Sequence, residues 1–485
     1  MGRNLRRAAL AALLAAPLPA AAQWQGPDAA PLFVNDGQPA SKHNYNYAPS
    51  LIAEGDVVHI WWCGRGPEPT DTDVVFHRTQ DRRTGAFGPA RVVLRSTPDT
   101  WDKTYVCDPG VVKGRFTNPA DGHSYTHALY YSGADNLPGH QNAVGLAFSN
   151  DGVTWVKYPE PVIRPQNTDP GKRETYGAGQ PGLFNADGKA GLFVFTTDTT
   201  TPERPGFGEI FVRHTADGVH FDPPVRMPNV ASDGALLFPN TDFAYDFRAG
   251  QVYTMAGLPG RGCTPPTHCK DPGKNPDRET YRMGLFAMPV GALLAGTGRW
   301  TPLGQLNTDV TGFYLNHSPG LLRDGHGNLT FDLPRVTVYF AGGDPYPGTW
   351  NIAAAVQTQA SPTLPLRRAL RPRDGQHWVS AGYIAPDFAP ESVLGAVWRL
   401  REPGTAPLYS CQVGTGPHFL SRDPACEGQI VLGETGYVSE APRPGTRPIY
   451  RCLAPASGSH FVSTDPACEG QRSEGPLGHV LAGAP

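Results

Sequence analysis

Short runs of alternating apolar and polar residues, separated by glycine- and proline-containing turns, cover most of this chain. In NAVGLAFSNDGVTWVKYPEPVI, residues 142–163, Val144, Leu146 and Phe148 mark one face of a β-strand. The Asp-Gly pair that follows fits a tight turn with positive φ, and Trp155 opens the next strand. A fainter copy, TADGVHFDPP, comes 66 residues later. A strand-based repeat of this length predicts the blades of a β-propeller.

Five stretches share one plan: a short polar start, a strand, a turn, and a second strand rich in aromatic residues. They begin at Tyr47, Asp108, Gln180, Asp242 and His317. Successive starts lie 61, 72, 62 and 75 residues apart, the size of a four-stranded blade with one or two long loops. Convincing amphipathic helices are nearly absent after residue 25. We therefore predict an all-β chain with a five-bladed β-propeller over residues 30–398.

The end of the chain carries a different repeat. APLYSCQVGTGPHFLSRDPACEGQ, from Ala406, is copied by RPIYRCLAPASGSHFVSTDPACEGQ, from Arg447, at an offset of 41 to 42 residues. The stretch REPGTAP, near residue 400, has the composition of a linker. We predict a small β-rich tandem repeat domain over residues 404–485, with its two copies at 406–440 and 447–482. Copies this short need their disulfide for stability.

The first residues, MGRNLRRAALAALLAAPLPAAAQ, have the pattern of a secretory signal peptide over residues 1–22. Three arginines precede a short apolar run, and three alanines form a small-residue cleavage site. The run is too short to span a bilayer and is interrupted by Pro17 and Pro19. We therefore expect a secreted or periplasmic protein without an integral membrane segment.

The charge of the chain excludes some partners. The formal net charge is −3, and it becomes −6 when the signal segment with its three arginines is removed. A mildly acidic chain without a basic stripe argues against nucleic acid as a partner. The chain also has no zinc-protease motif, G-x-S-x-G elbow, P-loop or dinucleotide fingerprint.

Eight cysteines in an exported chain predict disulfides. The favoured pairs are two within the C-terminal copies, one closing a small loop, and one tying neighbouring blades: Cys411–Cys426, Cys452–Cys468, Cys263–Cys269 and Cys63–Cys107. Sequence alone leaves the connectivity open. A metal site is the rival reading, but no C-x-x-C pair stands near a histidine.

One group of motifs resembles a known class of enzymes. The order D-P-x-V-V, Y-Y-S-G and S-x-D-G-x-x-W-x-K-Y-P-x-P-V-I is similar to the five-bladed β-propeller glycosidases of glycoside hydrolase families 43, 32 and their relatives. The resemblance covers residues 40–390 and is closest over 107–163. It implies a hydrolase for a polysaccharide or oligosaccharide bound in the central funnel. The C-terminal copies resemble a repeat module of unknown function at the ends of secreted bacterial hydrolases. We expect a monomer.

The resemblance also implies site residues. Such enzymes use an aspartate from each of the first two blades and a glutamate from the third. Here Asp108 fits the second blade, whereas the first offers NYNYAPS and the third places Gln180 where an acid would stand. Glycoside cleavage needs one protonated and one ionised carboxyl. We therefore expect Asp242 in the fourth blade and Glu174, before the third inner strand, to supply the other catalytic acids.

The remaining funnel residues suit the binding of sugar hydroxyls. Asn46, Gln180 and His317 would donate and accept hydrogen bonds, and Trp101 would stack on a sugar ring. In related propellers a histidine at the place of His317 helps to hold a central cation, so a calcium or sodium ion on the axis is expected, with no cofactor required for the reaction. The alternative function is a carbohydrate-binding or adhesion propeller that does not cut its ligand.

Overall fold

The computed structural model describes most of the chain from residue 45 onward and two short pieces before it. The described residues are 24–25, 31–32, 45–136, 140–167, 175–185, 191–200, 208–247, 249–259, 281–313, 315–329, 335–343, 350–358, 363–381, 384, 387–398, 401–414 and 416–483. The expected signal segment, Glu174 and the Cys263–Cys269 pair lie outside these residues.

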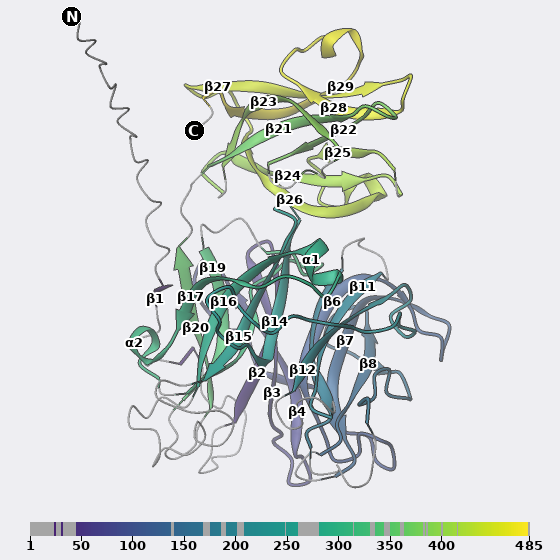
Figure 1. Ribbon diagram of the computed structural model, residues 1–485, viewed down its shortest axis with the longest axis vertical. Helices are drawn as coiled ribbons and strands as arrows, with labels where there is room; N and C mark the ends of the chain where they lie inside the picture. The colour runs from purple at the N-terminus through teal and green to yellow at the C-terminus, as the bar shows by residue number, and fades with distance from the viewer. Residues whose placement is uncertain are drawn as a thin grey trace, which may run out of the picture.

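Five blades of antiparallel strands form the propeller (Figure 1). Blades 1, 2 and 3 are separate four-stranded sheets, whereas blades 4 and 5 are joined by one parallel pairing, Tyr281 with Leu315. Blade 1 contains β2 (Asn46–Glu54), β3 (Val57–Arg65), β4 (Asp73–Asp81) and β5 (Arg91–Leu94). Blade 2 contains β6 (Tyr105–Thr117), β7 (Ser124–Ala134), β8 (Ala143–Ser149) and β9 (Val156–Lys157). Blade 3 contains β10 (Ala178–Asn185), β11 (Leu192–Asp198), β12 (Glu209–Thr215) and β13 (Val225–Arg226). Blade 4 contains β14 (Phe238–Asp246), β15 (Gln251–Pro259), β16 (Tyr281–Pro289) and β17 (Thr301–Leu306), with the short helices α1 (Val290–Leu294) and α2 (Thr308–Thr311) beside it.

Blade 5 is assembled from both ends of the propeller segment. Its strands β18 (Leu315–Leu321), β19 (Arg335–Gly343) and β20 (Asn351–Thr358) are joined by β1 (Trp24–Gln25). Trp24 pairs with Gln357, and Gln25 pairs with Val356. Because the first strand completes the last blade, the ring is held closed by backbone hydrogen bonds. The predicted all-β, five-bladed architecture is confirmed.

The S-N-D-G turn and its copy connect neighbouring blades. Gly152 and Gly218 have φ values of 71° and 86°, as a turn with positive φ requires. The Trp61 indole of blade 1 donates a hydrogen bond to the Gly152 carbonyl at 2.8 Å. The Tyr130 hydroxyl of blade 2 donates to the Gly218 carbonyl at 2.5 Å. The repeated turn is therefore a fastening point between blades.

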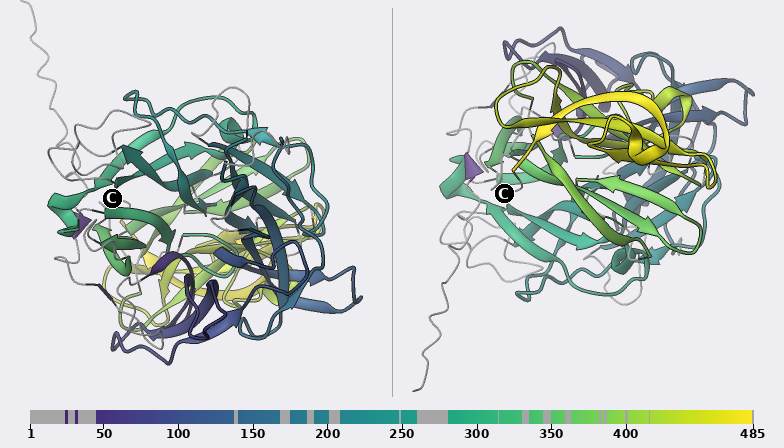
Figure 2. Two further views of the ribbon diagram at one scale, coloured as in Figure 1. Left: turned by 90° about the horizontal axis from the view of Figure 1, so that it is seen from below. Right: turned by 90° about the horizontal axis from the view of Figure 1, so that it is seen from above.

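The C-terminal strands pair into one nine-stranded sheet, green to yellow in Figure 1, and Figure 2 shows both bodies from below and from above. It contains β21 (Thr363–Arg371), β22 (Gln376–Ser380), β23 (Ala389–Trp398), β24 (Thr405–Gln412), β25 (His418–Ser421), β26 (Ile430–Ser439), β27 (Thr446–Ala454), β28 (Ser459–Ser463) and β29 (Arg472–Leu481). The short 3-10 turns η2 (Cys426–Gly428) and η3 (Cys468–Gly470) follow β25 and β28. The expected boundary at residue 398 would place strands β21 to β23 in the propeller. In the structure these strands belong to the C-terminal sheet, which begins at Thr363.

Strands β21 to β23 form a third unit of the C-terminal repeat. They pair in the same order as the two copies found in the sequence, although this unit has no cysteine. Each unit also places a histidine ring on an aromatic ring of a neighbouring unit. The three pairs are His377 with Phe461, His418 with Trp378 and His460 with Phe419, at centroid distances of 5.2, 4.2 and 5.5 Å. The three units therefore interlock in a cycle.

Three of the four expected disulfides fall within the described residues, and all three are present there. Cys63–Cys107 joins blade 1 to blade 2, while Cys411–Cys426 and Cys452–Cys468 each lie inside one C-terminal unit.

Among the helices of the described segments, none has the length and apolar character needed to cross a membrane.

A buried arginine fastens several blades at the centre of the ring. Arg323, which follows β18, is 1% exposed. Its guanidinium lies 3.0 Å from a carboxylate oxygen of Asp242 and donates to the Leu183 and Phe243 carbonyls at 3.0 and 2.8 Å. It also reaches the Ser50 hydroxyl at 3.3 Å. One side chain of blade 5 thereby contacts blades 1, 3 and 4.

We expect Arg323→Met to lower the free energy of unfolding of the propeller by about 3–5 kcal/mol, because it leaves the Asp242 carboxylate buried without its cation. Urea denaturation followed by tryptophan fluorescence measures this loss. Arg164→Met, which removes an exposed guanidinium paired with Glu160, is the matched control and should change stability by less than about 1 kcal/mol. Equal effects of the two substitutions would contradict a fastening role for Arg323.

Candidate functional site

The inner strand of every blade is interrupted by a β-bulge at the same place. The pairing register shifts between Tyr47 and Ser50, Cys107 and Gly110, Gly179 and Gly182, Phe238 and Asp242, and His317 and Gly320. Inside each bulge one residue has a left-handed backbone: Ala48 (φ 44°), Asp108 (47°), Gln180 (54°), Asn240 (68°) and Ser318 (44°). For such residues this conformation costs about 1–3 kcal/mol, so its recurrence in all five blades indicates a shared structural purpose.

That purpose is a small pocket around the propeller axis. The five bulge residues and their neighbours Pro49, Pro109, Pro181, Thr241, Asp242 and Pro319 line it. The cavity volume is about 30 Å³, room for about two water molecules when roughly 10–15 Å³ holds one. A sugar ring is far larger, so a carbohydrate would contact the rim of this pocket and the side chains above it.

Amide side chains close the axis on the side of blades 3, 4 and 5. The carboxamide of Gln180 both donates to the Asn240 side chain and accepts from the Asn240 backbone, the latter at 3.0 Å. Ser318 donates to the same Asn240 oxygen at 3.1 Å, and the His317 Nε2 atom lies 3.2 Å from the Asn240 Nδ2 atom. The two ends of the Gln180 side chain are thus engaged in joining blades, which differs from its expected role in binding sugar.

Asp108 is the bulge residue of blade 2 and the acidic residue among the five bulge residues. It is 7% exposed. Its Oδ2 atom accepts hydrogen bonds from the Ser132 hydroxyl at 3.0 Å and from the Tyr176 hydroxyl at 2.9 Å. Burial raises the pKa of Asp108, whereas these two hydrogen bonds act in the opposite direction.

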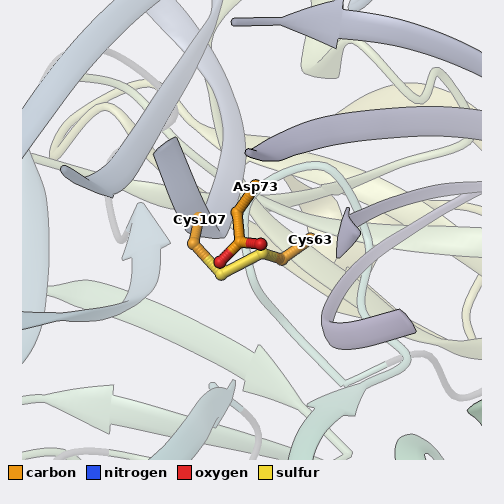
Figure 3. Close-up of side chains that lie close together, drawn as sticks. All are labelled: Cys63, Asp73 and Cys107. Carbon is orange, nitrogen blue, oxygen red and sulfur yellow. A yellow bond between two sulfur atoms is a disulfide. The ribbon is translucent and has the colours of Figure 1, made fainter. Parts of the chain in front are cut away.

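A second carboxyl, that of Asp73 on β4, lies against the disulfide between blades 1 and 2 (Figure 3). One of its oxygens is within 4.8 Å of both sulfur atoms, and Asp108 Oδ1 is 3.6 Å from Cys107 Sγ. Because both carboxyls lie beside the same disulfide, their nearest oxygens are less than about 9.5 Å apart. That is the upper end of the separation between the two carboxyls of a glycosidase. Since both sulfurs are bonded to each other, this group does not act as a thiolate metal site.

The two carboxyls influence each other's protonation. Burial and then the negative charge of Asp108 raise the pKa of Asp73 to about 7, against the opposing effect of Arg65. Two desolvated carboxyls this close do not both ionise readily at neutral pH. The arrangement provides one proton donor and one proton acceptor in the same place.

Aromatic side chains surround this pair and continue toward blade 5. Tyr45 stacks on Tyr47 at 5.5 Å, and the Tyr47 ring meets the edge of Trp350, also at 5.5 Å. Burial, followed by the charge of Asp73, raises the pKa of the Tyr45 hydroxyl. Burial, followed by the charge of Asp108, also raises the pKa of Tyr105, whose hydroxyl donates a hydrogen bond to Asn142. These hydroxyls are therefore neutral groups, which suits hydrogen bonding to an uncharged ligand.

The other residues expected in the site have structural contacts. Asp242 lines the pocket, but Arg323 and the Leu321 backbone N–H bind its two oxygens at 3.0 and 2.7 Å, so it is not placed to exchange a proton with a substrate. Asn46 is buried and accepts a hydrogen bond from the Trp62 indole at 2.9 Å. Trp101 packs on Tyr131 at 5.8 Å in the core between blades 1 and 2.

Sequence reasoning missed Asp73, Tyr176 and Arg323. Asp73 belongs to the third strand of its blade, whereas the residues expected in the site belong to the inner strands or their approaches. Its one sequence signal is the stretch DVVFH, in which an acid opens an apolar strand. The bulges had a clearer signal, because four of the five bulge residues precede a proline.

The axis does not offer the ligand set of a calcium ion, which takes six to eight oxygens. Of the described side chains around the pocket, the oxygens of Gln180, Asn240 and Asp242 already accept hydrogen bonds from protein groups. The nitrogen of His317 next to the pocket faces the Asn240 amide. These residues do not fit the expected cation, and no step of the chemistry below uses one.

No protein-family model matches the chain, and no curated protein matches it in sequence. Solved structures resemble it at low identity. An α-L-arabinofuranosidase from Podospora anserina, in complex with cellotriose, is 13% identical, with 71% of this chain and 99% of that chain covered and a TM-score of 0.45. The catalytic domain of a Coprinopsis cinerea arabinofuranosidase is 12% identical (70% and 98% covered, TM-score 0.44), and an endo-arabinase from Bacteroides thetaiotaomicron is 11% identical (64% and 93%, TM-score 0.40).

We expect a metal chelator to leave the thermal stability of the propeller unchanged, because protein groups already satisfy the axial oxygens. Differential scanning fluorimetry with EDTA, and with added calcium or sodium, measures this. A rise in melting temperature with calcium that Asn240→Ala abolishes would show that a cation replaces the amide contacts.

Proposed function

We propose that this protein is an exported glycoside hydrolase whose carboxyl pair is Asp73 and Asp108. The observation that carries the proposal is the placement of two desolvated carboxyls beside one disulfide at the rim of the propeller axis. Glycoside cleavage requires one carboxyl that holds a proton and a second that is ionised.

In this mechanism Asp73 donates its proton to the glycosidic oxygen as the bond to the anomeric carbon breaks. Asp108 acts at the anomeric carbon, either by taking a proton from the attacking water or by attacking directly and being released by water afterwards. Separations of about 6.5–9.5 Å favour the first course and about 5 Å the second. NMR of the first anomer released distinguishes them.

The surroundings of the pair suit a neutral, hydroxyl-rich substrate. The aromatic rings of Tyr47 and Trp350 are half-buried beside the axis, and the neutral hydroxyls of Tyr45 and Tyr105 lie close to the carboxyls. Stacking on aromatic faces and hydrogen bonds to hydroxyl groups are the interactions that a polysaccharide or oligosaccharide offers. The signal pattern of residues 1–22 and the disulfides support the export that the proposal includes.

We expect Asp73→Asn and Asp108→Asn each to lower kcat/KM by at least about 100-fold, because an amide neither donates nor accepts the required proton. Release of reducing sugar from arabinans, xylans and fructans measures the activity. The wild-type rate should fall as the pH rises past about 7, where Asp73 loses its proton.

Asp222→Asn, at an exposed carboxylate paired with His214, is the control and should retain wild-type activity. If the wild-type protein binds a glycan without releasing any sugar across this panel, the hydrolase proposal fails. The alternative of a carbohydrate-binding or adhesion propeller would then account for the same aromatic and hydroxyl groups.

A further inference from the structure

The two carboxyls differ sharply in their hydrogen bonding. One oxygen of Asp108 accepts two O–H groups, from Ser132 and Tyr176. The carboxyl of Asp73, by contrast, has no hydrogen bond and no ion pair with any residue in the part of the chain that the structure describes. Donors aimed at a carboxylate favour its ionised form, and a desolvated carboxyl without donors favours its neutral form.

One of the two donors, Ser132, is itself held by the backbone of blade 3. The Gln180 N–H donates to the Ser132 hydroxyl oxygen at 2.9 Å, which occupies one of its lone pairs and favours turning its hydrogen elsewhere. Ser132 Oγ and Tyr176 Oη lie 3.0 Å apart, each within reach of the same Asp108 oxygen. Ser132 is fully buried, so water does not replace Asp108 as its partner.

The sequence leaves room for this arrangement at one glycine. A Cβ atom on Gly179 would stand 2.3 Å from Tyr176 Oη and 2.5 Å from Ser132 Oγ, far inside van der Waals contact. Gly179 has no positive φ, so the backbone conformation does not demand glycine there. Space for the two hydroxyls is the reason that the structure supplies.

We propose that Tyr176 and Ser132 are positioning residues that hold Asp108 as the ionised carboxyl of the pair and thereby leave Asp73 as the carrier of the proton. The inference rests on the proposed function for its catalytic meaning, while the ionisation order itself is a property of the free protein. The other titratable groups facing the pair are Tyr45, Tyr105 and Arg65. They are present whichever of the two carboxyls holds the proton.

The test is the titration of the two carboxyls in Tyr176→Phe, which removes one donor and keeps the ring. With ¹³C-carboxyl-labelled aspartate, and with Asp73→Asn and Asp108→Asn to assign the signals, NMR follows each carboxyl against pH. A hydrogen bond to a charged group is worth enough to raise the pKa of Asp108 by about one unit in the variant. We expect the acidic limb of the kcat/KM profile to move upward by a similar amount. Ser132→Ala should act in the same direction.

Tyr125→Phe is the matched control, because Tyr125 also donates its hydroxyl to a carboxylate, that of Asp121, at 2.8 Å on the surface of blade 2. It should leave both the signals of the pair and the pH profile unchanged. Unaltered titration of Asp108 in folded Tyr176→Phe and Ser132→Ala, or a wild-type protein in which Asp108 binds its proton before Asp73 as pH falls, would overturn the inference. Correct titration order in a protein that cleaves no glycoside would instead reject the hydrolase proposal and leave the positioning role standing.

Discussion

The ion pair between Arg323 and Asp242 is the constraint on which the arrangement of the blades depends. Charged groups lose their hydration when they are buried, and only close partners compensate for that loss. Arg323 meets this requirement with a carboxylate from blade 4 and backbone carbonyls from blades 3 and 4. Any relative shift of these blades would leave a buried charge without partners. The inner strands of blades 1, 3 and 4 are therefore held at the axis by one buried side chain of blade 5.

The five bulges have the same backbone conformation, but their side chains differ from blade to blade. These side chains make one side of the site chemically different from the other. The same left-handed backbone presents an alanine, an aspartate, two amides and a serine to one small space. On blades 3 to 5 these groups satisfy one another. On blade 2 the aspartate turns instead toward Ser132 and Tyr176. The proposed acid chemistry is thus confined to the side of the axis where the disulfide joins blades 1 and 2.

The sequence was informative where the fold repeats and misleading where contacts are non-local. Asp108 and Gln180 were found because each stands at the start of an inner strand in the repeated blade pattern. In blade 4 the same pattern led to Asp242, two residues beyond the bulge residue Asn240. The contact that occupies Asp242 could not be foreseen from local sequence, because its partner Arg323 is 81 residues away. Asp73 meets Asp108 only through the folding of two blades. The third C-terminal unit escaped notice because it lacks the cysteines that mark the other two.

The completion of blade 5 by β1 has a consequence for how the molecule is made. Trp24 pairs with Gln357, so this pairing forms only after nearly the whole propeller has been synthesised. The hydrogen bonds that close the ring are therefore the last to form. Contacts between residues so distant in sequence are slow to form, because the entropy of closing the chain is lost before they stabilise it. Until then the outer edge of β20 remains an open strand edge, the kind of surface on which neighbouring nascent chains aggregate.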